Sequence, residues 1–312
     1  MFVKMFRALK STVVRQDKSS LESGNKKFAF VHIPKTAGMT MSAILERKFL
    51  KNEICPIRLY PDLLAMPKEE INKYRVFRGH FPYEILGCLL DEPFRCITIL
   101  REPVARYYSY YKFMKNREDF EKFSFLAKEV PLIRKMDFKE FANATNLSVV
   151  KDGLNQQCRY LGKEIPETVA LPYLAGKKDP TPDEIERAKT RLSTMDAFGL
   201  AERFQDSLFL MSFAFGWEPI MDNLVLNASG RSERSEITED VKAFIEEKNK
   251  ADVELFQFAK ALFETKYQEM ISTLVTQYGK KVGIQASPNM PPENIFKLLE
   301  QHANSQKKQR KI

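Results

Sequence analysis

The sequence is poor in the residues that build metal centres and disulfide frameworks. It contains four cysteines, none of them in a Cys-x-x-Cys pair, and its three histidines are His32, His80 and His302. A structural zinc site needs four suitably spaced cysteine or histidine ligands, so we expect no metal site. We expect the four thiols to be reduced, as thiols are in a cytosol.

Long apolar runs are also missing. No stretch approaches the roughly 18 residues of a membrane-spanning helix, and the N-terminus carries no cleavable apolar region. With 312 residues, of which 44% are apolar and 12% aromatic, the chain is typical of a globular protein with one main domain. We therefore expect a cytoplasmic protein.

The two ends of the chain differ in composition from the middle. The N-terminal stretch "MFVKMFRALK" alternates apolar and basic residues like an amphipathic helix that could contact an anionic membrane, although a frayed terminus or a transit peptide would look similar. Near the C-terminus, the proline-containing "QASPNMPPEN" precedes the basic "KKQRK". We expect a basic segment at residues 1–27, one domain at residues 28–282 and a basic tail at residues 283–312.

Positive charge outweighs negative charge in this chain. The 50 Lys and Arg against 41 Asp and Glu give a net charge of +9 at pH 7. Such an excess favours acidic partners, among them nucleotides, anionic glycans and nucleic acid. A noncatalytic protein that binds anionic glycans or nucleic acid is therefore one interpretation, and binding that weakens steeply with salt would identify it.

Short apolar segments alternate with helical patterns along the chain. The apolar segments are rich in aromatic and β-branched residues and are bounded by basic residues, proline or glycine, as buried strands are. The alternation predicts an α/β fold with a central parallel β-sheet flanked by helices, in which ligands bind at the carboxyl ends of the strands. The predicted strands are residues 28–33, 74–81, 95–100 and 196–204, and the predicted helices include residues 40–49, 104–114, 181–192, 207–217 and 252–275.

The stretch "FVHIPKTAGMT" runs from the first predicted strand into the first predicted helix. Pro34 ends the strand, and Thr40 is suited to cap the helix that follows. A strand–loop–helix turn directs backbone N–H groups and the positive end of the helix dipole to one point, which makes it an anion site. Lys35 and Thr36 are expected to add side-chain donors there.

This loop does not match the P-loop of nucleotide-hydrolysing enzymes. That pattern, Gly-x4-Gly-Lys-Ser/Thr, ends in the Lys, whereas Lys35 precedes Gly38 here. The strand "CITIL" is followed by Arg101, where a magnesium-dependent enzyme would usually carry an Asp that holds the metal. A magnesium-dependent nucleotide kinase or other phosphotransferase is thus an alternative that both features disfavour. The strand ends predict a site for an anion without a metal.

Two motifs resemble one known family. "HIPKTAGMT" resembles the 5′-phosphosulfate-binding loop of sulfotransferases, and "REPVARYYSYY" resembles their 3′-phosphate-binding strand end and helix. "RGHFP" and "GLAERF" are most similar to the branch with carbohydrate sulfotransferases of the heparan and chondroitin type and their bacterial relatives. The resemblance covers roughly residues 28–270 in motif order. It implies a P-loop-like sulfotransferase fold and 3′-phosphoadenosine 5′-phosphosulfate as the donor.

The resemblance also implies roles for residues around the donor. Lys35 would contact the 5′-phosphosulfate and stabilise the leaving oxygen. Arg101 and Ser109 would hold the 3′-phosphate, and a guanidinium group is suited to bind phosphate bidentately. Many family members carry a hydroxyl residue where this chain has Met39. The donor-binding loop would comprise Lys35, Thr36, Ala37, Gly38, Met39 and Thr40.

His80 is the residue that the resemblance links most directly to catalysis. In the carbohydrate branch, a His in a similar Gly-His stretch takes the proton of the acceptor hydroxyl, and an ordinary imidazole pKa of about 6.5 suits that task. Glu84 is the alternative base. His32 is expected to lie in the core or behind the site, and Arg106 is expected to serve packing or an ion pair.

Two polar segments are further candidates by resemblance. "GLNQQCRYLG" resembles a family segment that flanks the cleft, so Asn155, Gln157 and Arg159 are candidates to orient the acceptor. "LNASGRSER" resembles a region that closes over the nucleotide. Its candidate residues are Asn227, Ser229 and Arg231.

The predicted activity is sulfuryl transfer from 3′-phosphoadenosine 5′-phosphosulfate to a hydroxyl. Transfer would be an in-line displacement without a metal, with His80 as the base and Lys35 at the leaving oxygen. The acceptor is expected to be a carbohydrate, with lipid, peptide and small-molecule hydroxyls as alternatives. No specific nucleic-acid partner is expected, and peripheral membrane contact would come from the N-terminal segment.

Overall fold

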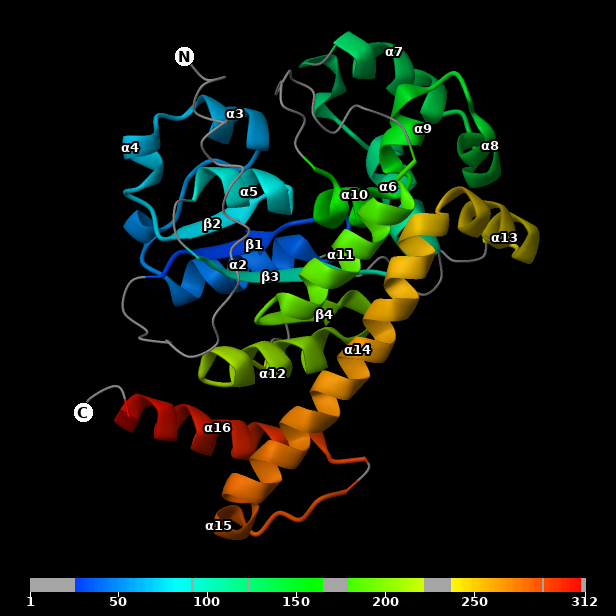
Figure 1. The fold of residues 1–312 in the computed structure, drawn as a ribbon. Helices are drawn as coiled ribbons and strands as arrows, with labels where there is room; N and C mark the ends of the chain where they lie inside the picture. The colour runs from blue at the N-terminus through cyan, green and yellow to red at the C-terminus, as the bar shows by residue number, and fades with distance from the viewer. Residues whose placement is uncertain are drawn as a thin grey trace.

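The structure is a computed structural model, and it describes residues 26–90, 93–122, 124–164, 179–221, 237–287 and 289–309. Almost all of the predicted N-terminal basic segment lies outside these ranges. Figure 1 shows a sheet surrounded by helices, with one long helix running along the molecule. Within the described ranges, no helix combines the length and the apolar character needed to cross a bilayer.

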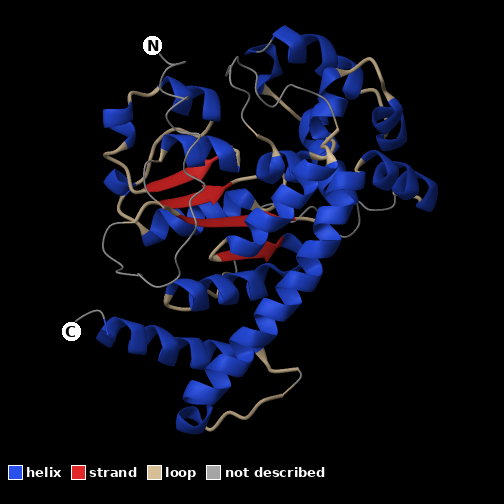
Figure 2. Ribbon diagram, in the orientation of Figure 1, coloured by secondary structure: helices blue, strands red, loops and turns tan. Residues whose placement is uncertain are grey.

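Four short strands form the sheet at the centre of the molecule (Figure 2). All neighbouring strands are parallel, in the order β2-β1-β3-β4, so their carboxyl ends meet at one edge of the sheet. The predicted α/β fold with a central parallel sheet flanked by helices is therefore confirmed. The strands are β1 (Phe28–Val31), β2 (Val76–Gly79), β3 (Arg95–Leu100) and β4 (Ala197–Leu200).

Helices cover both faces of the sheet, which explains why the strands are continuous apolar runs. Phe28 and Phe30 of β1 belong to the core on one face, while Ala29 and Val31 belong to the core on the other. This alternation follows from the two-residue period of a strand. The first face is covered by α2 (Gly38–Lys48) and α12 (Phe204–Phe215). The second is covered by α5 (Tyr83–Leu89), α10 (Gln156–Gly162), α11 (Pro182–Thr194) and α14 (Lys250–Leu274).

A second, smaller core fixes the helix that follows β3. Tyr107, Tyr108 and Tyr111 of α6 pack their rings against Phe138 and Phe141 at centroid distances from 4.9 to 6.1 Å. The tyrosine-rich segment therefore serves packing and sets the position of α6. The helices of this core are α6 (Pro103–Lys115), α7 (Ser124–Ile133), α8 (Phe138–Asn143), α9 (Ser148–Gly153) and α13 (Glu239–Lys248).

The connection from α2 to β2 runs along the outer edge of the sheet. An isolated bridge pairs Leu59 with His80, so this segment extends the parallel pairing beyond β2. Gly79 permits the close approach, because a Cβ atom there would lie 2.5 Å from the carbonyl oxygen of Arg58. The connection contains a 3-10 turn (Lys51–Glu53), α3 (Tyr60–Ala65) and α4 (Lys68–Ile71). Further 3-10 turns lie at Asp119–Lys122 and Ala201–Arg203.

The chain remains packed beyond the boundary predicted at residue 282. The final helix lies against α12 and α14 (Figure 1). Its residues Ile295, Leu298 and Leu299 are buried in the same core as the second face of the sheet. The fold therefore includes residues that were expected in a basic tail, because the apolar face of an amphipathic helix buries itself despite the prolines before it. The elements here are a π-helical turn (Val275–Gly279), α15 (Lys280–Val282) and α16 (Pro292–Gln309).

Candidate functional site

The loop between β1 and α2 is shaped by two residues in the left-handed backbone region. Lys35 has a φ of 71° and Ala37 a φ of 65°, values that residues other than glycine rarely adopt. Ala37 is the N-cap of α2, so the helix begins at Gly38, and the predicted cap Thr40 lies buried in its first turn. No side chain caps α2, and its first turn holds no acidic residue. The backbone N–H groups of that turn are therefore left for an anion.

The structure brings Lys35 and Arg101 together. Nη1 of Arg101 donates a hydrogen bond of 3.2 Å to the carbonyl oxygen of Lys35, which links the end of β3 to the loop after β1. Burial and the nearby charge of Arg101 lower the pKa of Lys35 from its ordinary value. Two neighbouring cations repel each other, so an anion that contacts both would relieve this repulsion.

One face of α6 is turned toward the same loop. Nζ of Lys35 lies 4.5 Å from the ring centroid of Phe113. Ser109 precedes Phe113 by one helical turn, so its half-buried side chain shares that face of α6. The structure therefore places Arg101 in contact with the loop that carries Lys35, and Ser109 on the same face of α6 as Phe113.

His80 follows β2 and is oriented by the backbone of the neighbouring strand. Its Nδ1 lies 2.8 Å from the carbonyl oxygen of His32. Because a carbonyl only accepts hydrogen bonds, Nδ1 carries the hydrogen, and Nε2 holds the lone pair of the neutral ring. Burial and the charges of Arg58 and Lys35 lower the pKa of His80, while the bond to His32 opposes this. At neutral pH, the imidazole of His80 is therefore uncharged.

His32 is enclosed between β1, His80 and the start of α2. Its ring stacks on Phe30 at 5.3 Å and lies 4.3 Å from the ring of His80. A Cβ atom at Gly38 would lie 1.9 Å from this ring, so glycine is needed there for His32 to fit. Burial first, then the charge of His80, lowers the pKa of His32 well below 6.5. This placement agrees with the expectation that His32 lies behind the site.

The other side chains of the loop point in different directions. Thr36 is fully buried, and its hydroxyl donates a hydrogen bond of 2.9 Å to the carbonyl oxygen of Ile33. Thr40 is also buried, whereas 62% of Met39 is exposed. Thr36 therefore stabilises the loop itself, and we expect the loop to bind a ligand chiefly through Lys35 and its backbone.

Known proteins offer one informative comparison. The chain is 34% identical over 101 residues to a protein-tyrosine sulfotransferase of Arabidopsis thaliana. The matched stretch is 32% of this chain and spans 19% of the relative's length. No family model matches the chain. The similarity supports the sulfotransferase family in general, and therefore a transferase, without distinguishing the carbohydrate branch.

Three residues predicted to orient the acceptor of a sulfotransferase are engaged within the protein. Asn155 Nδ2 binds the carbonyl oxygen of Lys248 at 3.0 Å, and Arg159 Nη2 binds that of Asp152 at 2.8 Å. The amide of Gln157 binds the backbone of Arg101. All three side chains are buried. We therefore expect them to hold the framework of the site instead of contacting an acceptor.

Glu84, the alternative base, is directed away from this role. Its carboxylate forms an ion pair with Arg191 of α11. That guanidinium also lies over the ring of Tyr83, 4.9 Å from its centroid. Because the Glu84 carboxylate is engaged by Arg191, His80 remains the better candidate.

Arg106 is fully buried, as a packing residue should be. It donates to the carbonyl oxygen of Gly153 and to Oε1 of Gln156, and its Nε lies 3.7 Å from the carboxylate of Asp252. The expectation that Arg106 serves packing and an ion pair is confirmed. Asp252 was missed in the sequence, because a single acid in a long amphipathic helix carries no signal of burial.

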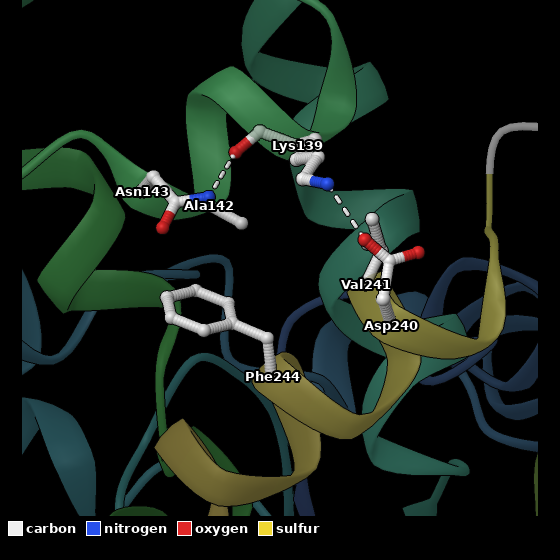
Figure 3. Close-up of a pocket in the computed structure, with 6 residues that line it drawn as sticks. All are labelled: Lys139, Ala142, Asn143, Asp240, Val241 and Phe244. Carbon is white, nitrogen blue, oxygen red and sulfur yellow. Dashed lines mark hydrogen bonds and ion pairs between the residues drawn. The ribbon is translucent and has the colours of Figure 1, made fainter.

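The pocket drawn in Figure 3 is a different place from this site. It has a volume of about 190 Å³, lies between α8 and α13, and is crossed by the ion pair of Lys139 and Asp240 at 2.6 Å. Phe244 forms part of its floor. None of the predicted site residues lines it, so we assign it no role in transfer.

Some predictions cannot be placed or tested in this structure. The candidates of the "LNASGRSER" region, Asn227, Ser229 and Arg231, lie outside the described residues. Within the described ranges, no three His, Cys, Asp or Glu side chains gather as a metal site requires. That transfer proceeds without a metal stays a prediction.

Proposed function

We propose that this protein transfers a sulfuryl group from 3′-phosphoadenosine 5′-phosphosulfate to a hydroxyl group, with a carbohydrate as the first candidate acceptor. The observation that carries the proposal is the hydrogen bond from Arg101 to the carbonyl oxygen of Lys35. It joins the two segments that resemble the 5′- and 3′-phosphate-binding motifs, which are far apart in the sequence. The partial match to a sulfotransferase supports the same activity.

The residues of the site fit such a donor. The uncapped N-terminus of α2 and the ammonium of Lys35 suit the 5′-phosphosulfate, which carries concentrated negative charge. The guanidinium of Arg101 and the hydroxyl of Ser109 suit the 3′-phosphate. These residues supply positive charge from the protein, which is the basis for proposing that no divalent metal is needed.

His80 removes the proton of the acceptor hydroxyl at Nε2, since Nδ1 is occupied by the carbonyl oxygen of His32. The acceptor oxygen then forms a bond to sulfur as the bond from sulfur to the 5′-phosphate oxygen breaks. Lys35 stabilises the negative charge that develops on that oxygen. Positioning and charge stabilisation account for most of the rate, because the transferred group needs no covalent intermediate.

A phenolic hydroxyl is the second candidate acceptor. The matched relative is named a protein-tyrosine sulfotransferase, so a tyrosine side chain in a peptide is a concrete alternative to a sugar. The enclosed, uncharged His80 suits either acceptor, because a base of lowered pKa is present in its neutral form at pH 7.

The decisive experiment is a transfer assay with labelled donor against a panel of glycans and tyrosine-containing peptides. We expect label to pass to one acceptor class in buffer that contains a chelator. Activity that appears only with magnesium and a nucleoside triphosphate would instead identify a phosphotransferase. Salt-sensitive binding of polyanions without any transfer would identify a noncatalytic binder.

We also propose that the protein acts in the cytoplasm, with peripheral membrane contact through the N-terminal segment as an option. The basic amphipathic pattern of "MFVKMFRALK" supports such contact. Sedimentation of the full chain with vesicles tests it. We expect the protein to sediment with vesicles that contain anionic lipid and to stay in the supernatant with neutral vesicles. Equal amounts of protein in the supernatant with both kinds of vesicle would rule out the contact.

A further inference from the structure

Arg101 lies directly beyond the sheet. The pairing of β3 with β4 ends at Leu100, which faces Leu200. The backbone of Arg101 needs other partners, because a half-buried N–H or C=O that lacks a hydrogen bond is costly. The side chain of Gln157 supplies both, since its Oε1 accepts from the N–H of Arg101 at 2.8 Å and its Nε2 donates to the carbonyl oxygen of Arg101 at 2.9 Å.

The side-chain amide of Gln157 forms the pair of hydrogen bonds that the backbone of a neighbouring strand would form. A primary amide has one acceptor and one donor in a plane, the same pair that a peptide group offers in a sheet. Gln157 therefore extends the ordered backbone of β3 by one residue. Only 1% of its surface is exposed, so water does not compete effectively for these two bonds.

Gln157 is itself fixed from behind. Asp252 of α14 accepts from the backbone N–H of Gln157 at 3.2 Å and from that of Cys158 at 2.8 Å. Asn155 accepts from the N–H of Asp252 at 3.2 Å, which closes the connection between α10 and α14. These bonds fix the backbone from which the Gln157 side chain extends, so the amide is anchored to α14 and constrains Arg101.

We propose that Gln157 is a positioning residue for Arg101 and thereby determines how strongly the protein recognises a 3′-phosphate. This inference rests on the proposed function, in which Arg101 binds the 3′-phosphate of the donor. The backbone of Arg101 is held by Gln157, and its guanidinium reaches the carbonyl oxygen of Lys35. Fixing both ends preorganises the guanidinium, so little ordering remains to be done when phosphate binds.

The test compares two probes, adenosine 3′,5′-bisphosphate and adenosine 5′-monophosphate, by titration calorimetry on the full chain. Gln157→Met keeps the length of the side chain and removes both hydrogen bonds. We expect it to weaken bisphosphate binding about tenfold while monophosphate binding changes less than about twofold, because only the former uses Arg101. A merely structural role of Gln157 would weaken both probes equally.

Two further variants make the outcome decisive. Gln156→Met is the matched control, because Gln156 lies beside Gln157 but binds Arg106 and not Arg101, so it should preserve the ratio of the two affinities. The double variant Arg101→Met with Gln157→Met should bind the bisphosphate no more weakly than Arg101→Met alone. Both changes act on the same contact, the one between Arg101 and the 3′-phosphate. Where Gln157→Met fails to fold, Gln157→Asn keeps a polar amide but moves it away from the backbone of Arg101. The same fall in the ratio of bisphosphate affinity to monophosphate affinity is then expected.

The possible results separate this inference from the function on which it rests. A wild-type protein that does not prefer the bisphosphate contradicts the proposed function and this inference together. A wild-type preference that survives in both folded Gln157 variants leaves the proposed function standing and overturns the role of Gln157.

Discussion

The turns that follow β1 and β3 lie at adjacent strand ends, yet the helices after them differ in how their N-termini are capped. After β1, α2 begins at Gly38 without a side-chain cap and without an acidic residue in its first turn. After β3, Glu102 caps α6 by accepting from the N–H groups of Val104 at 2.9 Å and Ala105 at 2.7 Å.

The difference indicates how the proposed anion site would be divided between backbone and side chain. The first turn leaves helical N–H groups and the positive end of the dipole for a ligand. The second turn uses its own carboxylate for those groups and contributes the guanidinium of Arg101. Under the proposed function, a donor with phosphates at two positions would meet a backbone site and a side-chain site, and substitutions should affect the two differently.

The largest effect is expected from His80, which belongs to neither turn. His80→Ala should reduce turnover by about 10²–10⁴ while affinity for adenosine 3′,5′-bisphosphate stays near the wild-type value, because only the transfer step needs the base. Turnover and calorimetric affinity, measured on the same preparation, test this. His302→Gln is the control, since His302 lies in α16 against the carbonyl oxygen of Phe213.

The pH dependence sharpens the same prediction. The pKa of His80 is lowered from 6.5, so its neutral form persists as the solution becomes mildly acidic. Turnover should stay constant from neutral pH down past 6.5 and fall only as the pH drops through this lowered pKa. A rate that begins to fall well above pH 6.5 would assign the base to another group.

The second effect concerns the side-chain turn. Arg101→Met should weaken binding of adenosine 3′,5′-bisphosphate by about 10- to 100-fold and spare adenosine 5′-monophosphate, because a hydrogen bond to a charged group contributes about 1.5–3 kcal/mol. Lys139→Met removes the same charge from an exposed ion pair and should change neither affinity. Equal losses in both variants would favour nonspecific attraction of polyanions.

The third test introduces at the start of α2 a carboxylate like the one that caps α6. Ala37→Asp places a carboxylate at the N-cap of α2, where Asp tolerates the left-handed backbone. We expect about tenfold weaker binding of both nucleotides, since each carries a 5′-phosphate, without loss of thermal stability. Ala37→Asn is the uncharged control and should weaken binding less. Unchanged affinity in Ala37→Asp would mean that the N-terminus of α2 does not bind the ligand.

The smallest effect is expected at Met39, which lies exposed in the first turn of α2. Met39→Ser introduces a hydroxyl that could add one hydrogen bond to a bound anion. A single neutral hydrogen bond contributes about 0.5–1.5 kcal/mol, so affinity for the bisphosphate should rise by a few-fold. Calorimetry decides the matter, and an equal or lower affinity would show that the backbone already satisfies the phosphosulfate site.

The strands were predictable from sequence because both faces of this sheet are buried. Apolar runs bounded by proline, glycine or basic residues coincide with β1, β2, β3 and β4. The start of α2 was less predictable. Thr40 is a favourable cap by residue type, but the left-handed conformation of Ala37 starts the helix at Gly38, and local propensity does not reveal that strain.

The end of the domain was misplaced for a related reason. The prolines and the terminal basic residues suggested a tail, although Ile295, Leu298 and Leu299 already carried a helical period. That period indicates an apolar face without showing what covers it. Only the folded chain shows that α12 and α14 provide the covering surface.

The sequence by itself determined the α/β class, the strand ends and the identity of the groups placed there, because periodicity and residue chemistry are local properties. It could not determine that Arg101 reaches the carbonyl oxygen of Lys35, that His80 is oriented by the backbone of His32, or that the amide of Gln157 bonds to the backbone of Arg101. These contacts join residues far apart in the chain. They exist because the strand order and the packing of α10 against α14 bring the segments together, which is a property of the tertiary structure alone.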